Sequence, residues 1–104
     1  MLDELVQFAK KYHSGFAEFT DEQVWRFFYA VRKTTLLSFG AWGELVGFAI
    51  YREYPDNLYF YCVAFAGSRF ENFRAIRAGL NGLTKKMIFW HDDNWMVHRC
   101  LLRL

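Results

Sequence analysis

With 104 residues and a formal net charge of +2, the chain is long enough to bury one core, and its charge is too small to imply a nucleic-acid partner by itself. We expect a single domain over residues 1–104. No apolar run approaches the roughly 18 residues of a membrane span. Acids precede the first apolar run, so we expect no signal peptide and no membrane association.

Aromatic residues make up 21% of the chain, and two interpretations of that share stay open. The rings either fill a core, because Phe occupies volume well, or lie on a surface that meets a partner. The two cysteines, Cys62 and Cys100, fall within apolar strand patterns and lack zinc-ligand spacing. We therefore expect buried thiols, a reducing compartment such as the cytoplasm, and no metal site.

The first third of the chain has the pattern of two helices. Apolar residues at helical spacing predict a helix over residues 2–12. Residues 20–23, Thr-Asp-Glu-Gln, match a capping box, in which side chains satisfy free N–H groups at a helix start. A second helix should begin there and run to about Lys33.

The apolar period then changes to two, which predicts three strands, over residues 34–40, 44–53 and 58–66. Residues 54–57, Tyr-Pro-Asp-Asn, have turn chemistry, and the connection before residue 44 is equally short. Short turns join antiparallel strands, so the three should form a meander. The third strand is apolar on both faces, and we expect it in the middle of the sheet, covered on both sides.

The last third should hold one helix and two strands. Ser68 is an expected N-cap with Glu71 as its capping-box partner, and Gly82 can close the helix. Strands are predicted over residues 85–92 and 95–103, joined by a turn at Asp93-Asn94. The fold class is therefore α+β, with two N-terminal helices and a mixed, mostly antiparallel five-stranded sheet carrying one helix. The element order is α-α-β-β-β-α-β-β.

This order resembles the GNAT superfamily of N-acetyltransferase-like proteins, over about residues 2–104. Two departures accompany the resemblance: the family's first strand is absent, and the Asp93-Asn94 turn replaces the helix between the last strands. Reduced versions of this kind resemble small proteins of bacteriophages and mobile elements. The resemblance thus implies a viral protein in the cytoplasm of a bacterial host or in a virion.

The resemblance also implies a cofactor loop. In the family, a Q/R-x-x-G-x-G/A loop at a helix start holds the pyrophosphate of acetyl-CoA on backbone N–H groups. Laid on this chain, the motif starts at Arg69, and its two small positions fall on Asn72 and Arg74, neither of which is small. We favour a capped helix start without a cofactor. The alternative is a divergent loop that binds acetyl-CoA through Ser68, Arg69, Phe70, Glu71 and Asn72.

Residues for proton transfer are also incomplete. The family often uses a carboxylate on the central strand and a late tyrosine, yet residues 58–66 contain no acid and no tyrosine follows residue 84. If the protein is an enzyme, Tyr61 and His98 are the candidates that remain. His91 beside Asp92-Asp93 does not indicate a metal site, because adjacent strand residues point to opposite faces.

We therefore expect a protein-binding module, an accessory, inhibitor or virion-type protein, whose partner is another protein or a second copy. Turns and sheet ends expose rings, and aromatics and Arg dominate many interfaces. An acetyl-CoA-dependent N-acetyltransferase is the alternative, and nucleic-acid binding by the modestly basic last third is possible but not favoured. The candidate partner-binding residues are Trp42, Tyr54, Trp90, Trp95, Arg74 and Arg77.

Overall fold

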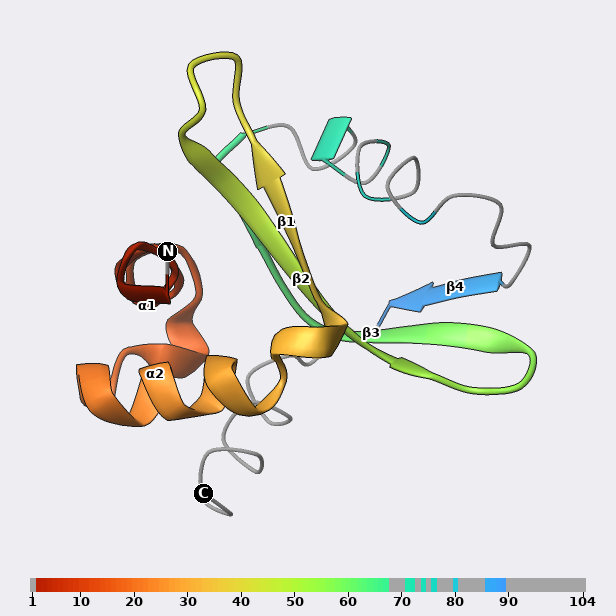
Figure 1. The fold of residues 1–104 in the computed structure, drawn as a ribbon, viewed down its shortest axis with the longest axis horizontal. Coiled ribbons are helices and arrows are strands. Elements are labelled where there is room, and N and C mark those ends of the chain that lie inside the picture. Colours follow the sequence, from red (N-terminus) through yellow and green to blue (C-terminus); the bar gives the residue numbers. More distant parts are fainter. Residues whose placement is uncertain are drawn as a thin grey trace.

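The structure is a computed structural model that describes residues 2–67, 71, 72, 74, 76, 80 and 86–89. These residues form two α-helices, two short 3-10 helices and four strands in an α+β arrangement (Figure 1). Their order along the chain is α1 (Leu2–Tyr12), η1 (Ser14–Phe16), α2 (Asp21–Ala30), η2 (Arg32–Thr34), β1 (Thr35–Phe39), β2 (Leu45–Glu53), β3 (Asn57–Phe65) and β4 (Lys86–Phe89).

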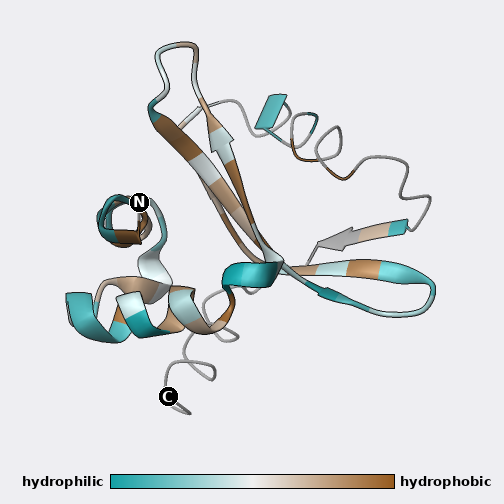
Figure 2. Cartoon of the chain, in the orientation of Figure 1, coloured by the Kyte–Doolittle hydropathy of each residue, from teal (hydrophilic) through white to brown (hydrophobic). Residues whose placement is uncertain are grey.

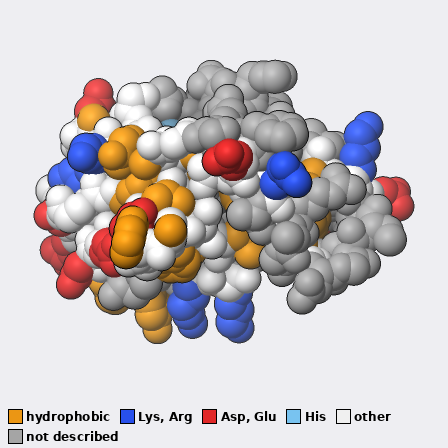
Figure 3. Space-filling view, turned by 90° about the horizontal axis from the view of Figure 1, so that it is seen from above, with side chains coloured by type: hydrophobic (Ala, Val, Ile, Leu, Met, Phe, Trp, Pro, Cys, Tyr) orange, Lys and Arg blue, Asp and Glu red, His pale blue; other side chains and the backbone are white. Residues whose placement is uncertain are grey.

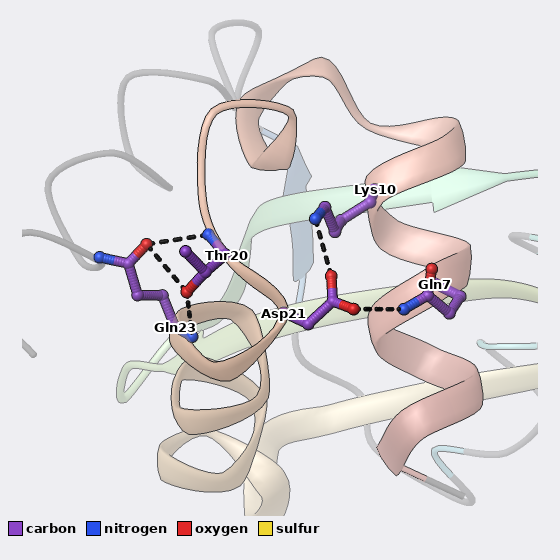
Figure 4. A network of polar contacts seen from close by, with 5 residues as sticks. All are labelled: Gln7, Lys10, Thr20, Asp21 and Gln23. Carbon is purple, nitrogen blue, oxygen red and sulfur yellow. Dashed lines mark hydrogen bonds and ion pairs between the residues drawn. The ribbon is translucent and has the colours of Figure 1, made fainter.

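Local side-chain contacts define the start of α2 and fix it to α1 (Figure 4). The Thr20 hydroxyl accepts the backbone N–H of Gln23, and the Gln23 side chain accepts the backbone N–H of Thr20, so the predicted capping box is confirmed. Asp21, the first helical residue, accepts hydrogen bonds from Lys10 at 2.7 Å and from Gln7 at 3.0 Å on α1. These bonds lower the pKa of the Asp21 carboxyl.

The end of α2 was predicted wrongly. The α-helix stops at Ala30 rather than at Lys33, and η2 follows it. The carbonyl of Val31 accepts the backbone N–H of Thr34 at 3.0 Å, and the Thr35 hydroxyl at 2.8 Å. Threonine hydroxyls compete in this way with helical hydrogen bonding, and the chain tightens into a 3-10 turn before β1.

The four described strands form one mixed sheet in the order β1-β2-β3-β4. The meander is confirmed: β1 pairs antiparallel with β2, and β2 pairs antiparallel with β3. β4 runs parallel to β3, with Asn57 opposite Lys86 and Phe60 opposite Phe89. Of the chain between them, residues 71, 72, 74 and 76 are helical. The predicted fifth strand, the Asp93-Asn94 turn and residues 90–92 lie outside the described residues.

Each face of the sheet has its own buried cluster. On the side of α1 and α2, the rings of Phe16, Phe27, Phe28 and Phe48 are 0–1% exposed and contact one another. The other face buries Ala49, Leu58, Phe60 and Val63 against Ile76 of the helical segment after β3. Hydrophobic residues accordingly run along the middle of β2 and β3 (Figure 2). The expectation of a central third strand covered on both sides is confirmed.

A bulge interrupts β3. Ile50 pairs with Cys62 and Tyr51 pairs with Phe60, so Tyr61 has no residue opposite it on β2. A bulge can turn two successive side chains to one face. Tyr61 and Cys62 accordingly both pack on the α1–α2 side, while Phe60 belongs to the opposite cluster. Tyr59 and Tyr61 share a face of the sheet, and the sequence did not predict the bulge.

Candidate functional site

The turn between β1 and β2 carries the most exposed large hydrophobic side chain of the described residues. Gly40 and Glu44 close the turn with a 2.8 Å backbone hydrogen bond, and the N–H of Gly43 is donated to the carbonyl of Gly40 at 3.1 Å. Gly43 has φ = 80°, a conformation that glycine adopts without a steric penalty. This three-residue loop places Trp42 at its tip, where the side chain is 93% exposed.

A side-chain hydrogen bond adds to the backbone contacts of this turn. The backbone N–H of Trp42 is donated to the Glu44 carboxylate at 3.0 Å. Phe39, the last residue of β1, is 46% exposed next to the turn. The hairpin projects from one end of the molecule (Figure 1), and hydrophobic side chains reach the surface at that end, with acidic ones beside them (Figure 3). We call Phe39, Trp42 and Glu44 the hairpin tip.

The other predicted contact residues do not join the hairpin tip. Tyr54 is 44% exposed in the β2–β3 turn, at the opposite end of β2, where its ring meets Tyr59 edge-on at 6.4 Å. Arg74 is exposed on the helical segment after β3. Trp90, Trp95 and Arg77 lie outside the described residues. The six predicted residues therefore do not all form one surface.

An exposed aromatic pair on α2 was not among the predicted contact residues. Trp25 and Tyr29 on α2 are 37% and 47% exposed, and their rings stack at 5.3 Å with an interplanar angle of 6°. The signal was present in the sequence. The two residues are four apart and lie off the apolar stripe of Val24, Phe27 and Phe28, which places them together on the outer face of the helix.

The structure describes part of the predicted cofactor loop. Glu71 is exposed, whereas Asn72 is 7% exposed and packs against the sheet. A Cβ added at Gly47 of β2 would clash with the Phe65 ring and would lie 3.1 Å from the Asn72 side chain, so the helical segment lies close to the strand there. The rest of the predicted loop, Ser68, Arg69 and Phe70, lies outside the described residues. No anion-binding site on the backbone N–H groups of these residues is therefore assigned.

Of the two predicted proton-transfer residues, Tyr61 is described and His98 is not. Tyr61 is 2% exposed on the bulge of β3, and the guanidinium of Arg52 lies 5.4 Å from the centre of its ring. The ring of Tyr61 therefore lies beside a cation. Cys62, next to it, is fully buried, as predicted.

Tyr61 forms part of an open cleft of about 650 Å³. It lies between the end of α2, η2 and the end of β2, and we call it the Arg52 cleft. Thr35 of β1 pairs with Ile50, so residues 51–53 of β2 extend past the start of β1, and η2 takes the place of a neighbouring strand. The charged and aromatic residues that line the cleft are Arg32, Lys33, Tyr51, Arg52, Glu53, Tyr54 and Tyr61.

One buried histidine has a structural role that the sequence did not indicate. His13 is 6% exposed, and its Nδ1 accepts the backbone N–H of Gly15 at 3.1 Å, which caps η1. Burial lowers the pKa of His13 from 6.5 to about 4, so the ring is neutral at pH 7. An acceptor nitrogen is available only on the neutral ring.

Neither metal binding nor membrane insertion finds support in the part of the chain that the structure describes. No group of three or more His, Cys, Asp or Glu side chains there could hold a metal ion. The described helices are too short or too polar to cross a bilayer. Comparison with protein-family models, curated proteins and solved structures finds no match for this chain.

Proposed function

We propose that this protein is a protein-binding module, with the hairpin tip as its contact surface. The observation that carries the proposal is the 93% exposure of Trp42 on a turn whose backbone is fixed by Gly40, Gly43 and Glu44. A tryptophan gains no burial from the fold in this position. Aromatic side chains on ordered turns become dominant contacts when a partner's pocket covers them.

The surroundings of the tip favour a partner surface that is apolar with a cationic or donor-rich rim. Phe39 adds exposed apolar area next to Trp42, and the Glu44 carboxylate supplies one negative charge. Little conformational entropy is lost on binding, because the turn is already closed by two backbone hydrogen bonds. The tip therefore has the composition of an interface core on a small scale, with aromatic residues inside and charge at the edge.

The position of Asn72 supports a binding role over catalysis. The family's cofactor loop needs small residues where the backbone approaches the pyrophosphate. Here Asn72 fills one of those positions and its side chain is buried against β2 and β3. Membership of the GNAT superfamily, as a reduced form of the kind found in bacteriophages, is part of the same proposal, and the mixed sheet with a parallel β3–β4 pair supports it.

Affinity capture with matched variants tests the proposal. Wild type, Trp42→Ser and Tyr29→Ser proteins are immobilised and exposed to host-cell extract, and captured proteins are identified by mass spectrometry. Tyr29 is an exposed ring on a different face and controls for general stickiness. We expect a partner that wild type and Tyr29→Ser retain and Trp42→Ser loses, with saturable binding when the partner is purified. Equal capture by all three proteins would overturn the proposal.

An acyl-CoA-dependent N-acetyltransferase is a second candidate. The observation that favours it is the parallel pairing of β4 with β3, because the resemblance that implies acetyl-CoA includes a mixed sheet. Calorimetry with acetyl-CoA decides between the candidates. Micromolar binding that Arg69→Glu abolishes would support the enzyme, and no heat at millimolar cofactor would exclude it.

A further inference from the structure

We propose that the Arg52 cleft binds a small organic anion that carries a flat ring, the class to which nucleoside monophosphates and aryl phosphates belong. The site is separate from the hairpin tip, and nothing in the proposed function assigns it a role. Its volume of about 650 Å³ falls in the range of small-molecule sites, roughly 300–1,000 Å³.

The charge of the cleft selects an anion. Arg32, Lys33 and Arg52 line it against one carboxylate, Glu53. Within the described part of the chain, the ion pairs are Lys10–Asp21 and Arg26–Glu22, and neither involves a cation of the cleft. Three cations with one acid among them give a positive potential, which concentrates anions and repels a protonated amine. The cleft is therefore poorly suited to bind the amine substrate of an acetyl transfer.

Two of the cations are already positioned. The Arg32 guanidinium donates to the carbonyl of Tyr29 at 2.7 Å and lies 4.2 Å from the centre of the Tyr29 ring. This contact offsets the partial negative charge at the end of α2, which would otherwise oppose an anion. The Arg52 guanidinium lies over the Tyr61 ring. An arginine held by its face keeps its N–H edge available, and that edge matches phosphate or carboxylate geometry.

The aromatic side chains of the cleft favour a ligand with a planar ring. Tyr54, which is 44% exposed, and Tyr61 both line the cleft, and the Arg52 guanidinium lies 5.4 Å from the centre of the Tyr61 ring. Exposed rings beside guanidinium groups stack on planar ligands, typically contributing about 1–3 kcal/mol per stacked base in nucleic-acid complexes. The ligand that fits these features has an anionic head near Lys33 and Arg52 and a ring against Tyr54.

Nuclear magnetic resonance titration of the full-length protein tests the inference. The probes are adenosine 5′-monophosphate, phenyl phosphate and benzoate, and adenosine is the uncharged control. We expect at least one anionic probe to produce saturable amide shifts confined to residues 30–34 and 51–54, and adenosine to bind at least tenfold more weakly. The Arg52→Glu variant should lose that binding, with at least a tenfold weaker affinity.

A charge-matched variant separates a built site from general electrostatics. Lys11 is exposed on α1 and does not line the cleft, so Lys11→Glu changes net charge by the same amount as Arg52→Glu. Retained binding in Lys11→Glu supports the site. Equal loss in both variants, shifts spread over the whole surface, or no saturation by any probe at 10 mM would each overturn the inference. Loss of partner capture by Trp42→Ser does not affect any of these outcomes.

Discussion

Two groups of aromatic side chains in this molecule occupy opposite environments. Phe16, Phe27, Phe28 and Phe48 lie between the helices and the sheet and are 0–1% exposed, with ring centres 5.2–6.3 Å apart. Trp42 and Phe39, at the hairpin tip, are 93% and 46% exposed. The four buried rings stabilise the fold. The two exposed rings would be buried only by contact with a partner.

The difference shows that the aromatic residues, 21% of the chain, are divided between the core and the surface. Phe16 contacts three other phenylalanine rings from a short 3-10 helix, so even a connecting segment contributes to the core. The hairpin tip directly follows a strand, yet its Trp42 ring is exposed to solvent. Stability and the proposed binding should therefore respond to different substitutions.

The largest effect is expected for Phe16→Ala. Removing a fully buried ring from this cluster should lower the free energy of unfolding by about 3–5 kcal/mol, because a cavity remains among three packed phenylalanines. Phe39→Ala, the matched control at the hairpin tip, should change it by less than about 1 kcal/mol, because the ring is half exposed. Urea unfolding followed by circular dichroism measures both changes. Similar losses of stability in the two variants would contradict the distinction between core rings and hairpin-tip rings.

A pH effect of somewhat smaller size is expected from His13. Its pKa is about 4 in the folded protein and 6.5 in the unfolded chain. Between these pH values, His13 is protonated in the unfolded chain and neutral in the folded protein. The free energy of unfolding should be unaffected above pH 6.5 and should fall by about 3 kcal/mol as the pH drops to 4. The hydrogen bonds from Lys10 and Gln7 lower the pKa of the Asp21 carboxyl, so its contribution to stability is lost at the acid end of this range and below it.

The variant His13→Asn isolates that contribution. An asparagine oxygen can accept the N–H of Gly15 in the same kind of cap but does not titrate. Urea unfolding of wild type and variant across pH 4–7 should show a steeper pH dependence for wild type. Parallel curves would mean that His13 is not the group responsible.

The features that the sequence predicted correctly depend on residues close together in the chain, and the features that it did not predict depend on contacts between distant segments. The capping box at Thr20 and Gln23 is local, and it was found. The bulge at Tyr61 was not, because β3 is apolar on both faces and shows no alternation for a bulge to break. The Arg52 cleft joins η2 to β2, residues about twenty apart in the chain. In the sequence each of its cations has the pattern of an ordinary solvated side chain.

The hairpin tip was partly predictable for the same reason. Trp42 lies between Ala41 and Gly43 in a tight turn, and a turn tip offers no core to a ring, so its exposure follows from local sequence. Tyr54 was grouped with it although the two lie at opposite ends of β2. Periodicity assigns a residue to a face or a turn, but which turns lie together depends on the sheet topology.

An intermediate effect is expected from the cap of α2. Thr20→Ala removes the acceptor for the Gln23 N–H and should lower the free energy of unfolding by about 1 kcal/mol. Thr20→Ser keeps a hydroxyl and should retain most of that stability. Both are measured by urea unfolding. A loss as large as that of Phe16→Ala would show that α2 depends on its first turn more than on the phenylalanine cluster.

The smallest effect on stability should come from the residue with the largest expected effect on binding. Trp42→Ser removes a side chain that is 93% exposed, so the free energy of unfolding should stay within about 0.5 kcal/mol of wild type. The same substitution should abolish partner capture. A large loss of stability would show that the ring contributes to the fold, and a binding defect could then no longer be attributed to a missing contact. The two measurements on one variant therefore decide whether the hairpin tip is an interaction surface.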